Sequence, residues 1–261
     1  MSQYFTFYSN KLGTPVVDNA AQNFISAAGI VDSTQQSAIT SLVINLKSAN
    51  IWNKMQALYP IIGGNMISHS YNLKDTNTFR ISFNSGSHDN NGYLPNSAIS
   101  PVNYYGTDII NNTLHLALYS LTNTIAQWDM GVVDSERIVQ AIIINRGVGL
   151  SASDIGDDNT FTNGTNNDGR GFYIGTRINP SNHKFFKNGV LLAANFTTTP
   201  IPIPTSPASY SIGGANSNAG QGAFSNKKIA FASIGEGLTE QECIAYTNIV
   251  QQYQTTLNRA V

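Results

Sequence analysis

Apolar side chains occupy every second position in several segments of this chain, and a period of two is the pattern of a β-strand that buries one face. The clearest examples are Phe79, Ile81 and Phe83, then Leu114, Leu116 and Leu118, then Phe172, Ile174, Thr176 and Ile178. We therefore predict strands over residues 79–83, 114–118 and 172–178, each with one side against a core.

Other local signals predict further strands. Asn188-Gly189 provides two residues that tolerate positive φ between strand-like flanks, so residues 184–192 are predicted to form a hairpin with a type I′ turn. Residues 138–144 are apolar at nearly every position, which predicts a central strand covered on both sides. One more strand is predicted over residues 228–234.

The stretches between these strands are dominated by Gly, Asn, Ser, Thr and Pro, so long polar loops are predicted over residues 84–108, 151–169 and 195–222. Residues 197–207 carry four prolines. Because proline cannot donate to a central ladder, we expect this segment to run extended along an edge.

Helical signals occur only near the two ends of the chain. Asp18-Asn19 offers an N-cap for a helix over residues 20–28, and Asp32 with Gln35 has the pattern of a capping box. Behind it apolar residues recur with the helical period at Ile39, Leu42, Val43 and Leu46, and the pattern continues through Ile51, Trp52 and Met55 to Pro60. Thr239 with Glu242 predicts the start of a last helix, whose apolar face is Cys243, Tyr246, Ile249, Val250, Tyr253 and Leu257.

Many strands with helices only at the ends predict a mainly β protein built as an antiparallel sandwich. We expect residues 1–60 to form a helical segment that packs on the sandwich or on a neighbouring subunit. Residues 61–237 are expected to form the sandwich, and residues 238–261 a closing helix.

Composition excludes several classes of function. Only 11% of the residues are charged, the formal net charge is −1, and Lys and Arg do not cluster, which argues against nucleic acid as a partner. No apolar run approaches the roughly 20 residues of a membrane span, so no membrane insertion is expected. The residues after Met1 lack the features of a signal peptide. Cys243 is the single cysteine, which excludes an intrachain disulfide and a cysteine-based zinc site, and we expect it to be buried.

Parts of the sequence resemble a known family. Residues 185–191 resemble the hairpin of laminin-G and concanavalin A-like jelly rolls, and residues 231–242 resemble the last strand and closing helix of those domains. More specifically, residues 24–30, 52–60 and 231–259 are similar to LamG-like proteins encoded by tailed phages of Bacteroidota hosts. The resemblance implies a concanavalin A-like jelly roll with helices at both ends.

It also implies a structural component of a phage particle, such as a head fibre, decoration, collar or tail appendage. Such a protein is expected in the virion, made in the host cytoplasm, and bound to other virion proteins and to copies of itself. The helices of residues 1–60 are the expected docking surface, because an apolar helix face beside a complete sandwich needs a cover.

Motifs for catalysis are missing, so we expect no enzyme. Concanavalin-like glucanases place carboxylates as Glu-x-Asp-x-x-Glu, and none of the four glutamates, Glu136, Glu236, Glu240 and Glu242, fits that pattern. The last three are interpreted as negative charge and capping groups at a helix start. Ser87-His88-Asp89 has the residue types of a triad, but consecutive side chains cannot act in series, so we interpret it as a polar turn. His69, His115 and His183 are isolated in the sequence.

No cofactor is expected, with calcium as an alternative. Oxygen-bearing side chains crowd one segment at Asp154, Asp157, Asp158, Asn159, Asn166, Asn167 and Asp168. Such ligands suit Ca²⁺, and jelly rolls often hold it in a rim loop, but the spacing fits no EF-hand and Asp/Asn clusters usually form turns.

The alternative function is a lectin-like, carbohydrate-binding module for host glycans. Tyr104 and Tyr105, near Asn103 and Asp108, are candidates to stack on a sugar, and so is Tyr93. Half-buried packing is the competing interpretation of these tyrosines. A polysaccharide-degrading enzyme with an unfamiliar site is the third hypothesis.

Overall fold

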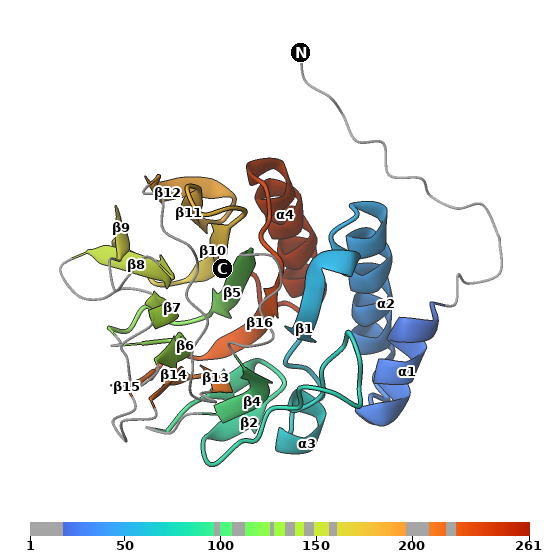
Figure 1. Cartoon of the computed structure of the whole chain (residues 1–261). Helices are drawn as coiled ribbons and strands as arrows, with labels where there is room; N and C mark the ends of the chain where they lie inside the picture. The colour runs from blue at the N-terminus through green and yellow to red at the C-terminus, as the bar shows by residue number, and fades with distance from the viewer. Residues whose placement is uncertain are drawn as a thin grey trace.

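A computed structural model describes residues 18–96, 100–105, 113–125, 128–133, 139–143, 149–156, 161–196, 209–217 and 223–261. Its strands form two sheets of eight strands each, and helices cover the outer face of one sheet (Figure 1). The helix-covered sheet, here sheet A, comprises β1 (Met55–Tyr59), β2 (Ser87–Asp89), β3 (Gly92–Leu94), β5 (Leu114–Ser120), β10 (Gly171–Arg177), β11 (His183–Lys187), β12 (Val190–Asn195) and β16 (Ile229–Gly235). Sheet B comprises β4 (Ser100–Tyr105), β6 (Met130–Val133), β7 (Val139–Ile143), β8 (Leu150–Ile155), β9 (Thr162–Thr165), β13 (Ser209–Ile212), β14 (Gly214–Ser217) and β15 (Ala223–Phe224).

Strand pairing is almost entirely antiparallel. Sheet A runs in the order β12-β11-β10-β5-β16-β3-β2, with β1 also paired to β16. Sheet B runs β15-β14-β6-β7-β8-β9, and β13 joins β4 and β6. The pair β14 and β6 is parallel, which departs from the predicted antiparallel arrangement. The chain is therefore a mainly antiparallel β-sandwich with a helical layer.

The central strands of sheet A are buried on both faces, so the hydrophobic core has two parts. Along β5, Ala117 and Tyr119 belong to the cluster under the helices, whereas Leu116 and Leu118 belong to the cluster between the sheets. Every residue of β5, β10 and β16 is buried. The predicted strands at residues 114–118 and 172–178 are thus confirmed, but the expectation of a single buried face was wrong because the helices cover the second face.

The helices begin where the sequence predicts. The helices α1 (Asn19–Ala27), α2 (Ser33–Ser48) and α4 (Glu240–Thr256) lie together on one side of sheet A (Figure 1). Asp18 accepts hydrogen bonds from the first turn of α1, Asp32 accepts one from Gln35 N, and Thr239 with Glu242 forms a reciprocal capping box at α4. Helix α3 (Met66–His69) is a single turn. Among the described residues, no helix is long and apolar enough to cross a membrane.

The helical prediction for residues 51–59 was wrong. Helix α2 ends before Asn50, whose φ is 58°, and one 3₁₀ turn at Trp52–Lys54 leads into β1. Strand β1 pairs antiparallel with β16. Ile51, Trp52 and Met55 are buried in the cluster under the helices, so their spacing reflects a shared core and not a continued helix.

The apolar face of α2 does not need an external cover. Ile39, Leu42, Val43 and Leu46 are at most 1% exposed, within a cluster that also contains residues of α4 and sheet A. The reason for expecting a docking surface on the N-terminal helices is therefore removed.

The predicted long loops contain strands. Strands β2, β3 and β4 lie within residues 84–108, strand β9 and all but the first residue of β8 lie within 151–169, and strands β13 and β14 lie within 195–222. Backbone pairing forms these strands without apolar alternation, as in β9, whose sequence is Thr-Asn-Gly-Thr. The proline-rich segment at 197–207 lies outside the described residues.

Residues 79–83, in contrast, form no ladder. Phe79 has a φ of 51°, which interrupts an extended run. Ile81 N donates to Ser70 O and Ser82 N donates to Pro101 O, so the segment makes isolated hydrogen bonds only. The strand prediction there was wrong, although Ile81 is buried between the sheets as the alternation implies.

The remaining predicted strands are present, while the expected covering of the strand at 138–144 on both sides stays a prediction. Asn188 and Gly189 have φ values of 48° and 77°, as the turn between β11 and β12 requires. Strand β16 covers the predicted strand at 228–234, and β7 lies between β6 and β8. Edge strand β12 of sheet A lies close to edge strand β9 of sheet B. Gly164 of β9 is so near to Leu192 of β12 that a Cβ added at Gly164 would lie 2.7 Å from Leu192 Cβ.

Candidate functional site

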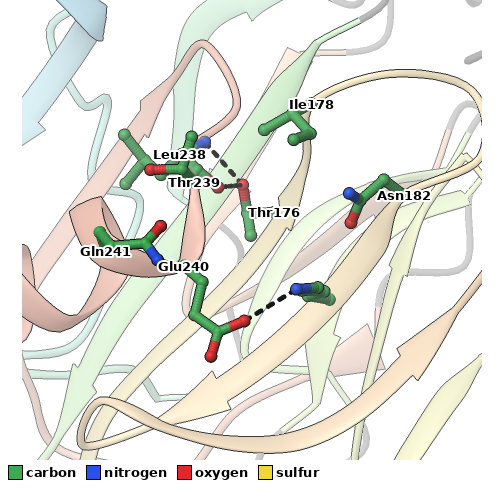
Figure 2. A pocket seen from close by; sticks show the side chains of 8 residues that line it. Thr176, Ile178, Asn182, Leu238, Thr239, Glu240 and Gln241 are labelled. Atoms are coloured by element: carbon green, nitrogen blue, oxygen red, sulfur yellow. Dashed lines mark hydrogen bonds and ion pairs between the residues drawn. The ribbon is translucent and has the colours of Figure 1, made fainter.

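A hollow of about 280 Å³ lies where helix α4 begins beside strands β10 and β11 (Figure 2). We call it the α4 hollow. Its lining residues come from two distant parts of the sequence and are Thr176, Ile178, Asn182, Lys184, Leu238, Thr239, Glu240 and Gln241. The volume is slightly below the roughly 300 Å³ at which pockets for small ligands begin, so it suits a small polar group such as one sugar ring.

Backbone contacts hold the two sides of the α4 hollow together. Thr176 Oγ1 accepts a hydrogen bond from Leu238 N at 2.7 Å and donates to Leu238 O at 3.0 Å. Gly237 approaches β10 so closely that a Cβ there would lie 2.1 Å from the main-chain oxygen of Arg177. The capping box at Thr239 then fixes the first turn of α4 and with it Glu240 and Gln241.

The α4 hollow contains one ion pair. Lys184 Nζ lies 2.8 Å from Glu240 Oε2, and Figure 2 shows this contact reaching from the helix start to β11. The neighbouring Glu242 contacts Lys54 Nζ at 2.7 Å. Burial alone would raise the pKa of Glu242, but hydrogen bonds from Lys54 and Thr239 outweigh it, so the pKa lies below its usual value. The carboxylate of Glu242 is therefore held in its anionic form, as the acceptor of these hydrogen bonds.

Two amide side chains complete the hollow. Asn182 and Gln241 line it, and within the described part of the chain neither side chain makes a hydrogen bond. An amide presents both a donor and an acceptor. With the carboxylate of Glu240 and the ammonium of Lys184, the α4 hollow offers donors and acceptors beside the apolar side chain of Ile178.

A second, more open groove of about 460 Å³ lies at the opposite end of β11, beside the β11–β12 turn. We call it the hairpin groove. Its lining residues are Thr165, Asn166, Asn167, Asp168, Lys187, Asn188, Val190 and Leu192. Successive residues of β11 point to opposite faces, so Lys184 reaches the helical side of sheet A while Lys187 shares the side of Phe185, between the sheets.

The structure separates the residues considered as calcium ligands. Asp154 is buried in β8, where its neighbour Ser153 pairs with Thr162. Asn166, Asn167 and Asp168 follow the other end of the same hairpin, where Leu150 pairs with Thr165. Three residue steps along a strand separate the two ends by about 10 Å. Asp157, Asp158 and Asn159 lie outside the described residues, and the part that is described holds no group of three metal-ligating side chains.

Of the tyrosines proposed to contact sugar, Tyr93 lines neither the α4 hollow nor the hairpin groove. Tyr93 is fully buried and its hydroxyl contacts Ser100 Oγ at 2.8 Å, so a role in stacking on a sugar was wrong for this residue. Tyr104 and Tyr105 belong to β4, but their side chains lie outside what the structure describes, and so do Asn103 and Asp108.

Ser87, His88 and Asp89 do not form a relay. The three residues form strand β2, so their interpretation as a polar turn was wrong. The turn follows at Asn90-Asn91, where Asp89 accepts hydrogen bonds from the backbone of Asn91 and Gly92. His88 instead contacts His69, so the interpretation of His69 as isolated was wrong. Their pairing across 19 residues of sequence was not visible in the spacing.

The other singled-out residues have structural partners. His115 contacts Glu236 O and Ser233 Oγ, and His183 contacts Ser153 and Thr162. Cys243 is buried as predicted, and burial raises the pKa of its thiol to about 12. Glu242 caps α4 as predicted, whereas Glu136 lies outside the described residues.

Comparison with known proteins reveals similarity in structure only. No family model matches the chain, and no curated protein is similar to it in sequence. A sialidase of Trypanosoma rangeli in complex with sialic acid superposes with a TM-score of 0.55 at 10% identity, over 83% of this chain and 39% of the sialidase. The K499G mutant of the NanB sialidase of Streptococcus pneumoniae superposes with a TM-score of 0.48 at 11% identity. The match covers 62% of this chain and 27% of the sialidase.

A smaller solved protein is similar over nearly its whole length. Domain 4 of AbnA, an arabinanase of Geobacillus stearothermophilus in complex with arabinotriose, gives a TM-score of 0.42 at 16% identity, over 74% of this chain and 98% of that domain. The chain spans well under half the length of the sialidases it matches. At these identities the comparison confirms the β-sandwich fold alone. The similarity to laminin-G-like phage proteins stays a prediction.

Proposed function

We propose that this chain is a carbohydrate-binding β-sandwich and that a neutral sugar unit occupies the α4 hollow. One observation carries the proposal: two amides without internal hydrogen bonds and one lysine–glutamate pair converge on a single hollow. A sugar hydroxyl both donates and accepts a hydrogen bond, so a set of mixed donors and acceptors matches it.

The fold supports this choice. The sialidase of Trypanosoma rangeli that superposes on this chain with a TM-score of 0.55 is in complex with sialic acid. A β-sandwich similar to this one therefore occurs in a protein that binds a saccharide. In the α4 hollow, Ile178 provides an apolar contact for the C–H groups of a sugar ring, and Glu240 and Gln241 project from the rigid start of a helix. A site on regular elements loses little conformational entropy when it binds.

The test is a titration calorimetry screen of neutral oligosaccharides, including host surface polysaccharide fragments. Gln241→Ala should weaken binding of the best ligand by about tenfold, the effect of losing roughly one to two hydrogen bonds. Gln22→Ala is the matched control, because Gln22 is also an exposed glutamine on a helix but lies on α1. Saturable binding that Gln241→Ala and Asn182→Ala leave unchanged would remove the α4 hollow as the site.

We further propose binding without catalysis. Hydrolysis of a glycosidic bond requires a carboxylic acid that can give up a proton near neutral pH, and enzymes raise its pKa for that purpose. Glu240, which lines the α4 hollow, contacts Lys184, and the nearby Glu242 contacts Lys54, which helps to lower the pKa of Glu242. Incubation with host capsule should produce no new reducing ends, and their appearance would contradict this proposal.

The similarity of residues 24–30, 52–60 and 231–259 to phage proteins motivates a location for the module. We propose that it is displayed on a virion, as a homo-oligomer bound to other virion proteins. Gold-labelled antibody against the chain should mark purified particles at a fixed place in electron micrographs. Particles without gold, with the protein free in the lysate, would favour a released lectin instead.

A further inference from the structure

Lys187 is a cation of the hairpin groove that makes no direct ion pair within the described residues, although the charge of Asp168 acts on it from a greater distance. Lys47, Lys54, Lys184, Lys227 and Lys228 each lie within 4 Å of a carboxylate. Lys187 has no such partner in the described part of the chain. Its Nζ donates to two neutral oxygens, Asn166 Oδ1 at 2.8 Å and the main-chain oxygen of Asp168. An ammonium has three N–H groups, so one donor remains for a ligand.

A buried network fixes the position of this ammonium. Asn166 is only 5% exposed, and its side-chain nitrogen donates to Ser151 Oγ at 2.6 Å and to Tyr173 Oη at 2.7 Å. Tyr173 Oη in turn donates to Asp168 O at 2.9 Å. The acceptors of Lys187 are therefore themselves held in place, so the lysine is positioned before any ligand binds.

The charges around the groove leave a positive excess at Lys187. Asp168 lines the groove, but its carboxylate makes a two-pronged contact with Arg170, through Nε at 3.0 Å and Nη2 at 2.8 Å. The Arg170 contacts lower the pKa of Asp168 to about 2, so this carboxylate stays anionic and paired. Burial and the nearby charge of Arg170 lower the pKa of Lys187, while the charge of Asp168 opposes this shift.

We propose that the hairpin groove binds a saccharide that carries a carboxylate, with the carboxylate on Lys187. The apolar side chains of Val190, which is 66% exposed, and Leu192 provide a surface for the sugar ring. The hydroxyl groups of the sugar would contact two amides of the groove, the side chain of Asn167 and the side-chain nitrogen of Asn188. The side-chain oxygen of Asn188 already accepts a hydrogen bond from Phe172 N. The groove shares no residue with the α4 hollow, so this site is independent of the proposed function.

The experiment compares trigalacturonate with its carboxyl-reduced, neutral counterpart by titration calorimetry. We expect the acidic trisaccharide to bind more tightly, and Lys187→Gln to weaken its binding by about tenfold or more, as the loss of a charge-assisted hydrogen bond does. Lys187→Arg should retain most of the affinity. Lys74→Gln is the matched control, because Lys74 is also half-buried and bonded to a main-chain oxygen but lines neither site.

A second measurement guards against misfolding of a variant. Backbone amide signals of Asn188 and Val190 in the unmodified protein should shift on addition of trigalacturonate and stay in place with the neutral trisaccharide. Gln241→Ala should leave trigalacturonate binding unchanged, which separates this groove from the α4 hollow. Equal affinity for both trisaccharides, absence of acidic binding, or binding that survives Lys187→Gln would each overturn the proposal.

Discussion

The Nδ1 atoms of His69 and His88 lie 2.9 Å apart and connect helix α3 to strand β2. When both rings are neutral, one Nδ1 donates its hydrogen to the other. The Nε2 atoms of both rings are buried without a hydrogen-bond partner in the described residues. A proton added to this pair would thus place a charge where water does not reach.

Stability should therefore fall when the pH drops below about 6.5, the pKa of an unperturbed histidine. Burial, together with the nearby charges of His88 and Arg259, lowers the pKa of His69 to about 3, and burial lowers that of His115 to about 4. Between these pKa values and about pH 6.5 the histidines bind protons in the unfolded chain but not in the folded chain. The free energy of unfolding therefore decreases as the pH falls through this range. Each histidine contributes a loss of about 2 kcal/mol between pH 7 and pH 5.

Urea denaturation at several pH values measures this loss. His69→Gln should flatten the dependence between pH 7 and pH 5, because one of the titrating groups is then missing. A dependence of the same steepness in wild type and variant would show that the pair is not responsible. Carboxylates with lowered pKa values, such as Asp168, contribute only at more acidic pH.

The buried pair of Asp129 and Lys227 should be sensitive to removal of one partner. Both side chains have no exposed surface, and Lys227 Nζ lies 3.5 Å from Asp129 Oδ1. Asp129→Ala leaves a buried ammonium without its carboxylate and should lower the free energy of unfolding by about 3–5 kcal/mol. The control is the more exposed ion pair between Lys47 and Asp18. Lys47→Gln breaks that pair and should lower the free energy of unfolding by at most about 1 kcal/mol. Similar small losses for both variants in chemical denaturation would contradict the prediction.

Gly237→Ala should disturb the α4 hollow. A Cβ there would meet the main-chain oxygen of Arg177 at 2.1 Å, so the start of α4 must move away from β10. We expect a loss of stability of about 1–3 kcal/mol, the usual range for overpacking, and weaker binding of the neutral ligand. Gly29→Ala is the control, since a Cβ there meets nothing within 4 Å and only its φ of 64° opposes the change. Unchanged thermal stability of Gly237→Ala would contradict the close approach.

Cys243 should resist alkylation in the native protein. Its side chain is buried in α4, and burial raises the pKa of its thiol to about 12, so almost no thiolate is present near neutral pH. Mass spectrometry after iodoacetamide treatment should show no adduct under native conditions and one adduct in denaturant. Rapid labelling of the folded chain would mean that α4 opens readily.

The parts of the fold that follow local rules were predictable. The turn at Asn188-Gly189 and the capping box at Thr239 depend on a few neighbouring residues, and both form as expected. Strand β1 was missed because its position depends on pairing with β16, which is distant in sequence. Strand β1 ends at Tyr59, whereas β16 begins only at Ile229. Short strands such as β9 were missed because polar sequences pair through the backbone without a hydrophobic pattern.

The candidate sites were less accessible to sequence reasoning. The α4 hollow joins residues 176–184 to residues 238–241. The strand, the hairpin and the helix start were each predicted, but no sequence signal indicated that they meet at one hollow. The sequence indicated the Asn and Asp residues at 166–168 as candidate calcium ligands, not as neighbours of a lysine. Their position beside Lys187 depends on the packing of two hairpins, which changes the expected ligand from a cation to an anion.

Because the helices and sheet B together enclose the central strands of sheet A, every residue of β5, β10 and β16 is buried and none of these strands offers an open face. Both sites described above accordingly lie at opposite ends of β11, at a helix start and at a turn. Turns and helix starts tolerate exchange of side chains far better than a doubly covered sheet does. The hollows at which we propose ligand binding therefore lie apart from the residues that maintain the fold, so their side chains can be exchanged while the interior stays constant.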